Sequence, residues 1–128
     1  MTNIFLVMGG GAVGAALRYQ LGRVLGAMVP GAAWTWCTFA ANLLGGFAMG
    51  LLAGWLARGS TMPGEPIRLL LGVGLLGGFT TFSAFSLETL LMIERGQLLV
   101  ALTYALASVI GAIVALALGL SLMRSIVA

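Results

Sequence analysis

The chain lacks histidine, aspartate and lysine, and it has one cysteine, Cys37. A disulfide within the chain is therefore impossible, and no zinc, iron–sulfur or Cys/His catalytic cluster can be built. Charge is also scarce, since 7% of the 128 residues are charged, against roughly 25% in a typical soluble domain. The six arginines and three glutamates are scattered singly, so the basic stripe that nucleic acid requires is missing. These absences argue against a soluble domain, a nucleic-acid binder and an enzyme.

What the chain has instead is long apolar runs, with 61% hydrophobic residues and a mean hydropathy of +1.15. Crossing a bilayer takes about 20 apolar residues. Four runs meet this length, at residues 4–28, 34–56, 67–93 and 97–123. The sequence therefore predicts an all-α membrane protein. Its four transmembrane helices form a single transmembrane domain, residues 1–128.

The arginines give little information on orientation. Four spans place both termini on one side, together with Arg58, Arg68 and Arg124, while Arg23 and Arg95 lie toward the other side. Three against two is a weak positive-inside bias. A chain with so little bias can insert both ways, and two opposed copies would form an inverted pair. Because the two halves show no convincing repeat, we expect any inversion to come from dimerisation.

Small residues recur at the spacing that brings membrane helices close together. Glycines four residues apart allow two backbones to approach. The pairs are Gly10 and Gly14, Gly46 and Gly50, and Gly74 and Gly78. We interpret them as helix-packing positions.

The third run contains the stretch GGFTTFSAFS, Gly77 to Ser86. Paired glycines and consecutive hydroxyl residues weaken a helix, and non-helical backbone in hydrocarbon is costly. The stretch predicts that the third helix is broken near Gly77–Thr80. The break would free backbone carbonyls.

Polar residues inside the first two spans are the first candidates for function. Arg18 either draws anions toward a vestibule or has a structural role. Thr38 and Asn42 are four residues apart and share one helix face. The Asn42 amide could donate to an ion, or it could make an interhelical hydrogen bond.

The third and fourth spans add rings and hydroxyls. Phe82 and Phe85 share a face, and their positive ring edges can face an anion, although such rings more often serve as core packing. Glu88 either is buried against a donor from another helix or reaches the interface. Tyr104 and Ser108 share a face, and the serine hydroxyl either bonds its own backbone or lines a path. Hydroxyls, an amide and ring edges suit an anion that must shed water and still move on.

These residues resemble the Fluc (CrcB) family of fluoride channels. The resemblance covers essentially the whole chain and rests on GGGAVGAALRY, TFAANLLGG and GGFTTFSAFSLE. It implies passive export of fluoride through an antiparallel, dual-topology homodimer with two pores in a bacterial plasma or inner membrane. It also implies a structural sodium ion at the dimer centre, held by the backbone carbonyls of Gly77 and Thr80.

The resemblance further implies roles for individual residues. Phe82 and Phe85 would line the pores with Asn42 beside them, and Arg18 would match the arginine of the first span. Polar tracks would be formed by Thr38, Ser83, Glu88, Tyr104 and Ser108. The chain departs from the family pattern at Cys37, Ala84 and Ala112.

Two other functions compete with the fluoride channel. A small dual-topology proton-coupled exporter would need a carboxylate in the first span, where this chain has none. A non-transporting assembly subunit would show no flux when purified. Fluoride efflux from liposomes, compared with chloride efflux, would separate these readings.

Overall fold

The computed structural model describes residues 1–28, 33–58 and 64–127. Within them the chain is helical and contains no strand. Three helices are continuous: α1 (Thr2–Met28), α2 (Ala33–Leu56) and α6 (Leu98–Val127). The remaining span is assembled from α3 (Gly64–Ile67), η1 (Arg68–Leu76), α4 (Gly77–Phe79) and α5 (Ser83–Glu94).

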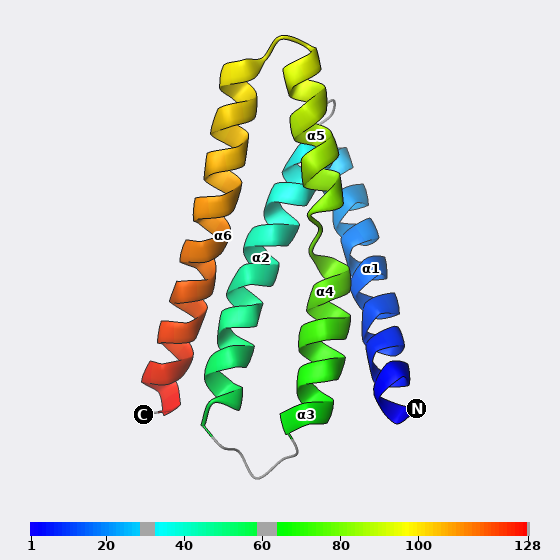
Figure 1. The fold of residues 1–128 in the computed structure, drawn as a ribbon, viewed down its shortest axis with the longest axis vertical. Helices are drawn as coiled ribbons and strands as arrows, with labels where there is room; N and C mark the ends of the chain where they lie inside the picture. Colours follow the sequence, from blue (N-terminus) through cyan, green and yellow to red (C-terminus); the bar gives the residue numbers. More distant parts are fainter. Residues whose placement is uncertain (29–32, 59–63, 128) are drawn as a thin grey trace.

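Four helical segments of the described chain are long and apolar enough to cross a bilayer: Thr2–Met28, Thr35–Leu56, Gly64–Glu94 and Leu98–Ile126. The four predicted spans are thus confirmed, with ends that differ by a few residues. Residues 29–32 and 59–63, in the gaps between the predicted spans, lie outside the described residues. Both termini lie at the same end of the bundle, as an even number of spans requires (Figure 1).

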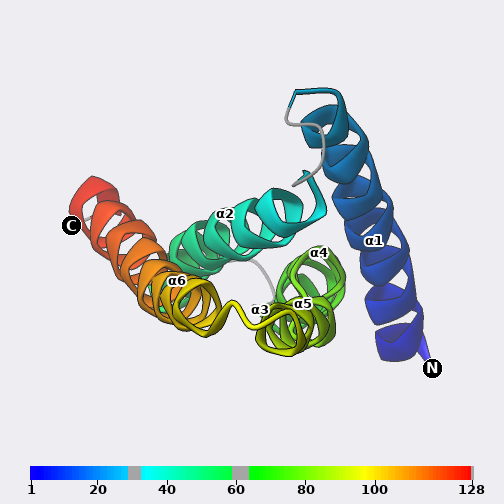
Figure 2. The ribbon, with the colours of Figure 1, turned by 90° about the horizontal axis from the view of Figure 1, so that it is seen from above.

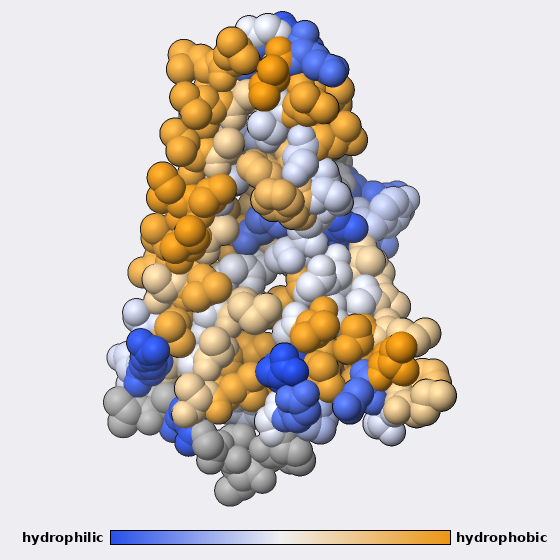
Figure 3. Space-filling model, viewed as in Figure 1, coloured by the Kyte–Doolittle hydropathy of each residue, from blue (hydrophilic) through white to orange (hydrophobic). Residues whose placement is uncertain are grey.

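The helices are arranged as two close pairs. α6 runs beside α2, and α1 runs beside the broken span (Figures 1 and 2). The left flank of the molecule is strongly hydrophobic, whereas paler and hydrophilic residues gather midway up the face shown in Figure 3 and reach its right edge. The hydrophobic flank suits contact with lipid chains, and the polar band lies at the height of the helix break.

Glycines close the seam between α1 and the broken span. A methyl group added to Gly10 would overlap the carbonyl oxygen of Leu70 and lie 3.0 Å from the Gly74 Cα atom. A methyl group added to Gly78 would lie 2.6 Å from the carbonyl oxygen of Gly11. Because these neighbours are backbone atoms, they cannot rotate away. The predicted pair Gly10 and Gly14 of α1 therefore packs against the predicted pair Gly74 and Gly78 of the broken span.

The third glycine pair closes the seam between α2 and α6. A methyl group on Gly46 would lie 2.9 Å from the Ala112 carbonyl oxygen, and one on Gly50 would overlap that of Leu116. Gly119 of α6 approaches the Phe47 backbone in the same way. All three pairs thus act as packing positions, which matches the small-residue rule for membrane helices.

The broken span changes its winding before it breaks. η1 is π-helical, so the Gly77 amide reaches the Gly72 carbonyl five residues back. Gly77 itself is still helical, with φ −62° and ψ −38°. The chain leaves the helix at Thr80, which is extended with φ −85° and ψ 159°, and α5 begins at Ser83. The break thus lies at Thr80–Phe82 and overlaps the predicted stretch only at its end.

Candidate functional site

Glu88 of α5 lies at the centre of a buried polar cluster. Its side chain is 1% exposed. Thr38 of α2 donates from Oγ1 to Glu88 Oε2 at 2.8 Å, and the Tyr104 hydroxyl of α6 donates to Oε1 at 2.9 Å. Three helices therefore meet at one carboxyl group. The prediction that hydroxyls from other helices could serve Glu88 is confirmed, and the alternative that it reaches the interface is wrong.

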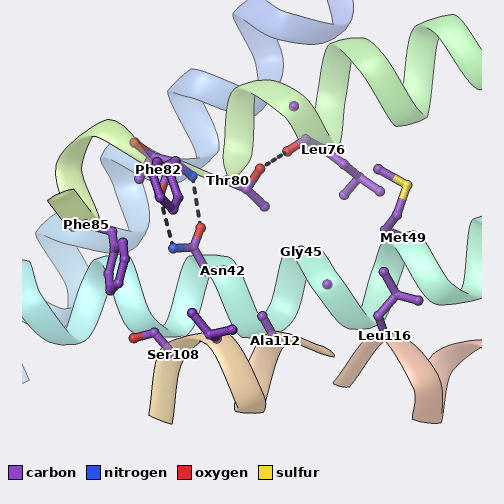
Figure 4. A pocket seen from close by; sticks show the side chains of 14 residues that line it. Asn42, Gly45, Met49, Leu76, Thr80, Phe82, Phe85, Ser108, Ala112 and Leu116 are labelled. Atoms are coloured by element: carbon purple, nitrogen blue, oxygen red, sulfur yellow. Dashed lines mark hydrogen bonds between the residues drawn. The ribbon is translucent and has the colours of Figure 1, made fainter. Parts of the chain in front are cut away.

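Asn42 lies one turn below Thr38 on the same face of α2, and it contacts the helix break. Its Nδ2 donates to the Thr81 carbonyl oxygen at 3.0 Å, and its Oδ1 accepts from the Thr81 amide at 2.9 Å (Figure 4). The amide side chain thereby replaces a neighbouring peptide group. Of the two alternatives for Asn42, the interhelical hydrogen bond is present, and it goes to backbone rather than to a side chain.

The two threonines of the break make different bonds. Thr80 Oγ1 donates to the Leu76 carbonyl oxygen at 2.9 Å, one turn back. Thr81 Oγ1 accepts from the Ala84 amide at 3.2 Å and lies 3.3 Å from Ser83 Oγ. A hydroxyl that accepts from an amide three residues later resembles an N-cap bond, although α5 begins at Ser83 and Phe82 is its N-cap residue. Thr81 therefore supplies an acceptor for an amide in the first turn of α5.

A cavity of about 360 Å³ opens beside the break. Figure 4 shows its walls, which come from α2, the broken span and α6. Its lining includes four residues predicted for the pore, Asn42, Phe82, Phe85 and Ser108, and the two predicted for the sodium site, Gly77 and Thr80. The structure thus brings six of the predicted residues to one hollow.

Ser108 supplies an unusual group to this cavity. Its side chain is 5% exposed, and its Oγ is the one buried side-chain polar atom without a hydrogen-bond partner within the described ranges. Burying an unpaired hydroxyl is unfavourable, so such a group invites a ligand or water. The alternative that Ser108 bonds to its own backbone is wrong.

The two phenylalanines behave differently. Phe85 is 9% exposed and packs between two rings, with centroid distances of 5.5 Å to Phe82 and 5.4 Å to Tyr104. Phe82 precedes α5 and is 74% exposed. Core packing therefore accounts for Phe85 within one chain, and it does not account for Phe82. The Phe85–Tyr104 contact joins the cavity to the Glu88 cluster.

Other predicted residues lie outside the cavity lining. Ser83 is exposed at the start of α5. Arg18 has a partly exposed side chain, and its backbone carbonyl accepts from Cys37 Sγ at 3.7 Å. Thr81 lines the cavity and was not among the predicted site residues. A hydroxyl placed just before a helix start is a capping pattern, but this pattern can be recognised here only once the start of α5 is known.

Comparison with known proteins assigns the chain to a family. Residues 5–120 match the family model described as CrcB-like protein, Camphor Resistance (CrcB). The chain is 52% identical over 127 residues to the fluoride-specific ion channel FluC of Novosphingobium aromaticivorans, covering 98% of this chain and 99% of the relative. It is 51% identical over 129 residues to the protein of the same name from Caulobacter vibrioides, with full coverage of both chains. The corresponding protein of Phenylobacterium zucineum is 55% identical over 129 residues, again over both full lengths.

These relatives carry the name of an ion channel rather than of an enzyme. The matched region contains the break, the cavity and the Glu88 cluster. Together, the four apolar spans, the resemblance in sequence and the similarity over the whole chain establish that this multi-pass membrane protein belongs to the CrcB family of fluoride channels.

Proposed function

We propose that this protein conducts fluoride passively out of the cytoplasm of a bacterial cell and so relieves fluoride toxicity. The observation that carries the proposal is the unpartnered Ser108 hydroxyl in a cavity that also has aromatic walls. A hydroxyl donor and ring edges attract an anion without the strong hold of a lysine or arginine. An anion bound in this way can also leave, which conduction requires.

Several polar and aromatic residues in and beside the cavity have a defined part in this function. Ser108 donates its hydroxyl to the ion. Phe82 and Phe85 present ring edges in place of lost water. Asn42 uses one Nδ2 hydrogen on Thr81, and the second Nδ2 hydrogen of the amide can serve a passing anion. The Glu88 cluster, formed by Glu88, Thr38 and Tyr104, continues the polar path beyond the Phe85–Tyr104 contact. Ser83 adds a hydroxyl to this path at the start of α5.

The working unit in this proposal is an antiparallel, dual-topology homodimer with two pores. Two observations support a second copy. Phe82 contacts the Phe85 ring but is 74% exposed beside the cavity, which leaves most of a large apolar ring uncovered within one chain. The arginines favour neither orientation strongly, so both can coexist in one membrane.

A sodium ion at the dimer centre is part of the proposal, and the residues fit it. The amide that would close a helical turn onto the Gly77 carbonyl belongs to Thr81, and it donates to Asn42 instead. The amide that would close onto the Thr80 carbonyl belongs to Ala84, and it donates to Thr81 Oγ1. Both carbonyl oxygens thus lack their helical donors. Oxygen ligands of this kind suit a hard cation, which when bound supplies a fixed positive charge near the pores.

The alternative of a proton-coupled exporter is not favoured. α1 contains no carboxylate. Both carboxylate oxygens of Glu88 in α5 accept hydrogen bonds from hydroxyl groups of other helices.

Efflux from liposomes tests the proposed function. Purified protein should release fluoride at a rate far above chloride, measured with ion-selective electrodes. Tags on the C-terminus should be accessible from both sides of the membrane in one population. Equal fluoride and chloride efflux would refute selectivity, and labelling from one side alone would refute dual topology.

A further inference from the structure

We propose that Asn42 and Thr81 are positioning residues for the central cation site. Each side chain takes a backbone amide that would otherwise hydrogen bond to a carbonyl oxygen of that site. The inference rests on the proposed function, because the sodium ion belongs to that proposal. It gives Asn42 a role toward the cation that differs from its predicted contact with fluoride.

The first amide is that of Thr81. In a continuous α-helix it would donate to the carbonyl of residue 77, four positions earlier. Here it donates to Asn42 Oδ1 at 2.9 Å, while Asn42 Nδ2 donates to the Thr81 carbonyl at 3.0 Å. The paired bonds fix the peptide of Thr81 from the neighbouring helix. The Gly77 carbonyl is left for another ligand.

The second amide is that of Ala84. Its helical acceptor would be the carbonyl of residue 80. Instead it donates to Thr81 Oγ1 at 3.2 Å, and Thr80 is extended so that the helix has ended. One residue, Thr81, therefore joins both arrangements. Its backbone is held by Asn42, and its hydroxyl releases the Thr80 carbonyl.

Removal of either side chain has a predictable consequence. Without Asn42, the Thr81 amide would be unpaired in a nonaqueous interior, which is unfavourable. The nearest repair is to close a helical turn onto Gly77, and that repair removes a carbonyl from the cation. In Thr81→Ala, the Ala84 amide loses its acceptor and closes a helical turn onto the Thr80 carbonyl, which removes that carbonyl from the cation. Serine at position 81 keeps the hydroxyl and should keep the site.

The experiment measures sodium binding apart from flux. The thermal midpoint of the purified dimer is compared in sodium and in N-methyl-D-glucamine after prolonged dialysis, since a cation that binds the folded state raises the midpoint. We expect Asn42→Ala and Thr81→Ala to need about tenfold more sodium for the same shift, as expected for loss of one hydrogen bond. Thr81→Ser should match the wild type. Ser108→Ala is the matched control, because Ser108 lines the same cavity and contacts neither amide.

Hydrogen exchange of the Thr81 and Ala84 amides, resolved by NMR, provides the second readout. Exchange should differ from that of the wild type at Thr81 in Asn42→Ala and at Ala84 in Thr81→Ala, because each amide changes its acceptor, with Ser108→Ala as in the wild type. Wild-type sodium dependence in both alanine variants would overturn the inference and leave fluoride conduction untouched. A wild type that lacks fluoride flux, yet shows the sodium shift and its loss in the variants, would overturn the proposed function alone. A wild type without any sodium shift would overturn the inference together with the proposed cation.

Discussion

Loss of one hydroxyl from the Glu88 cluster should destabilise the protein more than loss of a hydroxyl at its surface. Tyr104→Phe removes the donor to Glu88 Oε1, which lies at 2.9 Å, and retains the ring that packs on Phe85. Because Glu88 is 1% exposed, water cannot easily replace the lost donor. A buried acceptor left without its donor costs about 1–3 kcal/mol. Thr38→Val should cost a similar amount, since it removes the donor to Oε2.

The matched control is Tyr19→Phe. Tyr19 is 67% exposed on α1, so its variant should change the free energy of unfolding by less than about 0.5 kcal/mol. The assay is unfolding by SDS in mixed micelles, followed through the fluorescence of the three tryptophans. If Tyr104→Phe and Tyr19→Phe have equal free energies of unfolding, the Tyr104 hydrogen bond does not support Glu88 as described.

Three further predictions concern packing, the pore and topology. Gly50→Ala should lower the free energy of unfolding by roughly 1–3 kcal/mol, because its methyl group would lie 2.8 Å from the Leu120 amide nitrogen. Gly9→Ala is the control and should be neutral, since a methyl group there has nothing within 4 Å. Equal stability of the two variants would contradict the close packing at the glycine seams. Phe82→Ile and Phe85→Ile should each strongly lower fluoride efflux per assembled dimer, and wild-type efflux from both would show that the rings only pack. Two or three lysines added within residues 58–68 should bias insertion and reduce efflux, which an oppositely biased copy should restore; unchanged efflux in the biased protein would argue against inverted pairs.

The spans and seams could be predicted because they depend on local properties. Length and hydropathy set the spans, and glycine spacing set the positions of close approach. Neither reveals which helices are neighbours. The helices are apolar on nearly all sides, so no amphipathic stripe marks the inward face. The pairing of Gly10 with Gly74, and of Gly50 with α6, became visible only in three dimensions.

The site was predicted as a set of residues and not as a set of bonds. Glu88 needed a donor, but the choice of Thr38 and Tyr104 depends on three helices meeting at one level. The break was expected near Gly77–Thr80, yet Gly77 stays helical. It occurs at the threonines, because Asn42 and the Thr81 hydroxyl provide bonds that compensate for the lost helical ones. Thr81 was missed for the same reason, since its capping role depends on where α5 begins.

The polar contacts between α2 and the broken span determine how far one helix can slide along the other. Two apolar helices can shift by one turn, about 5.4 Å, and still find side chains of similar size opposite each other. Asn42 and Thr38 hold α2 at two levels, at Thr81 and at Glu88. A one-turn shift would separate both sets of partners in a medium that offers no replacement. These contacts therefore act as a register lock, and they set the depth in the bilayer at which the third span is interrupted.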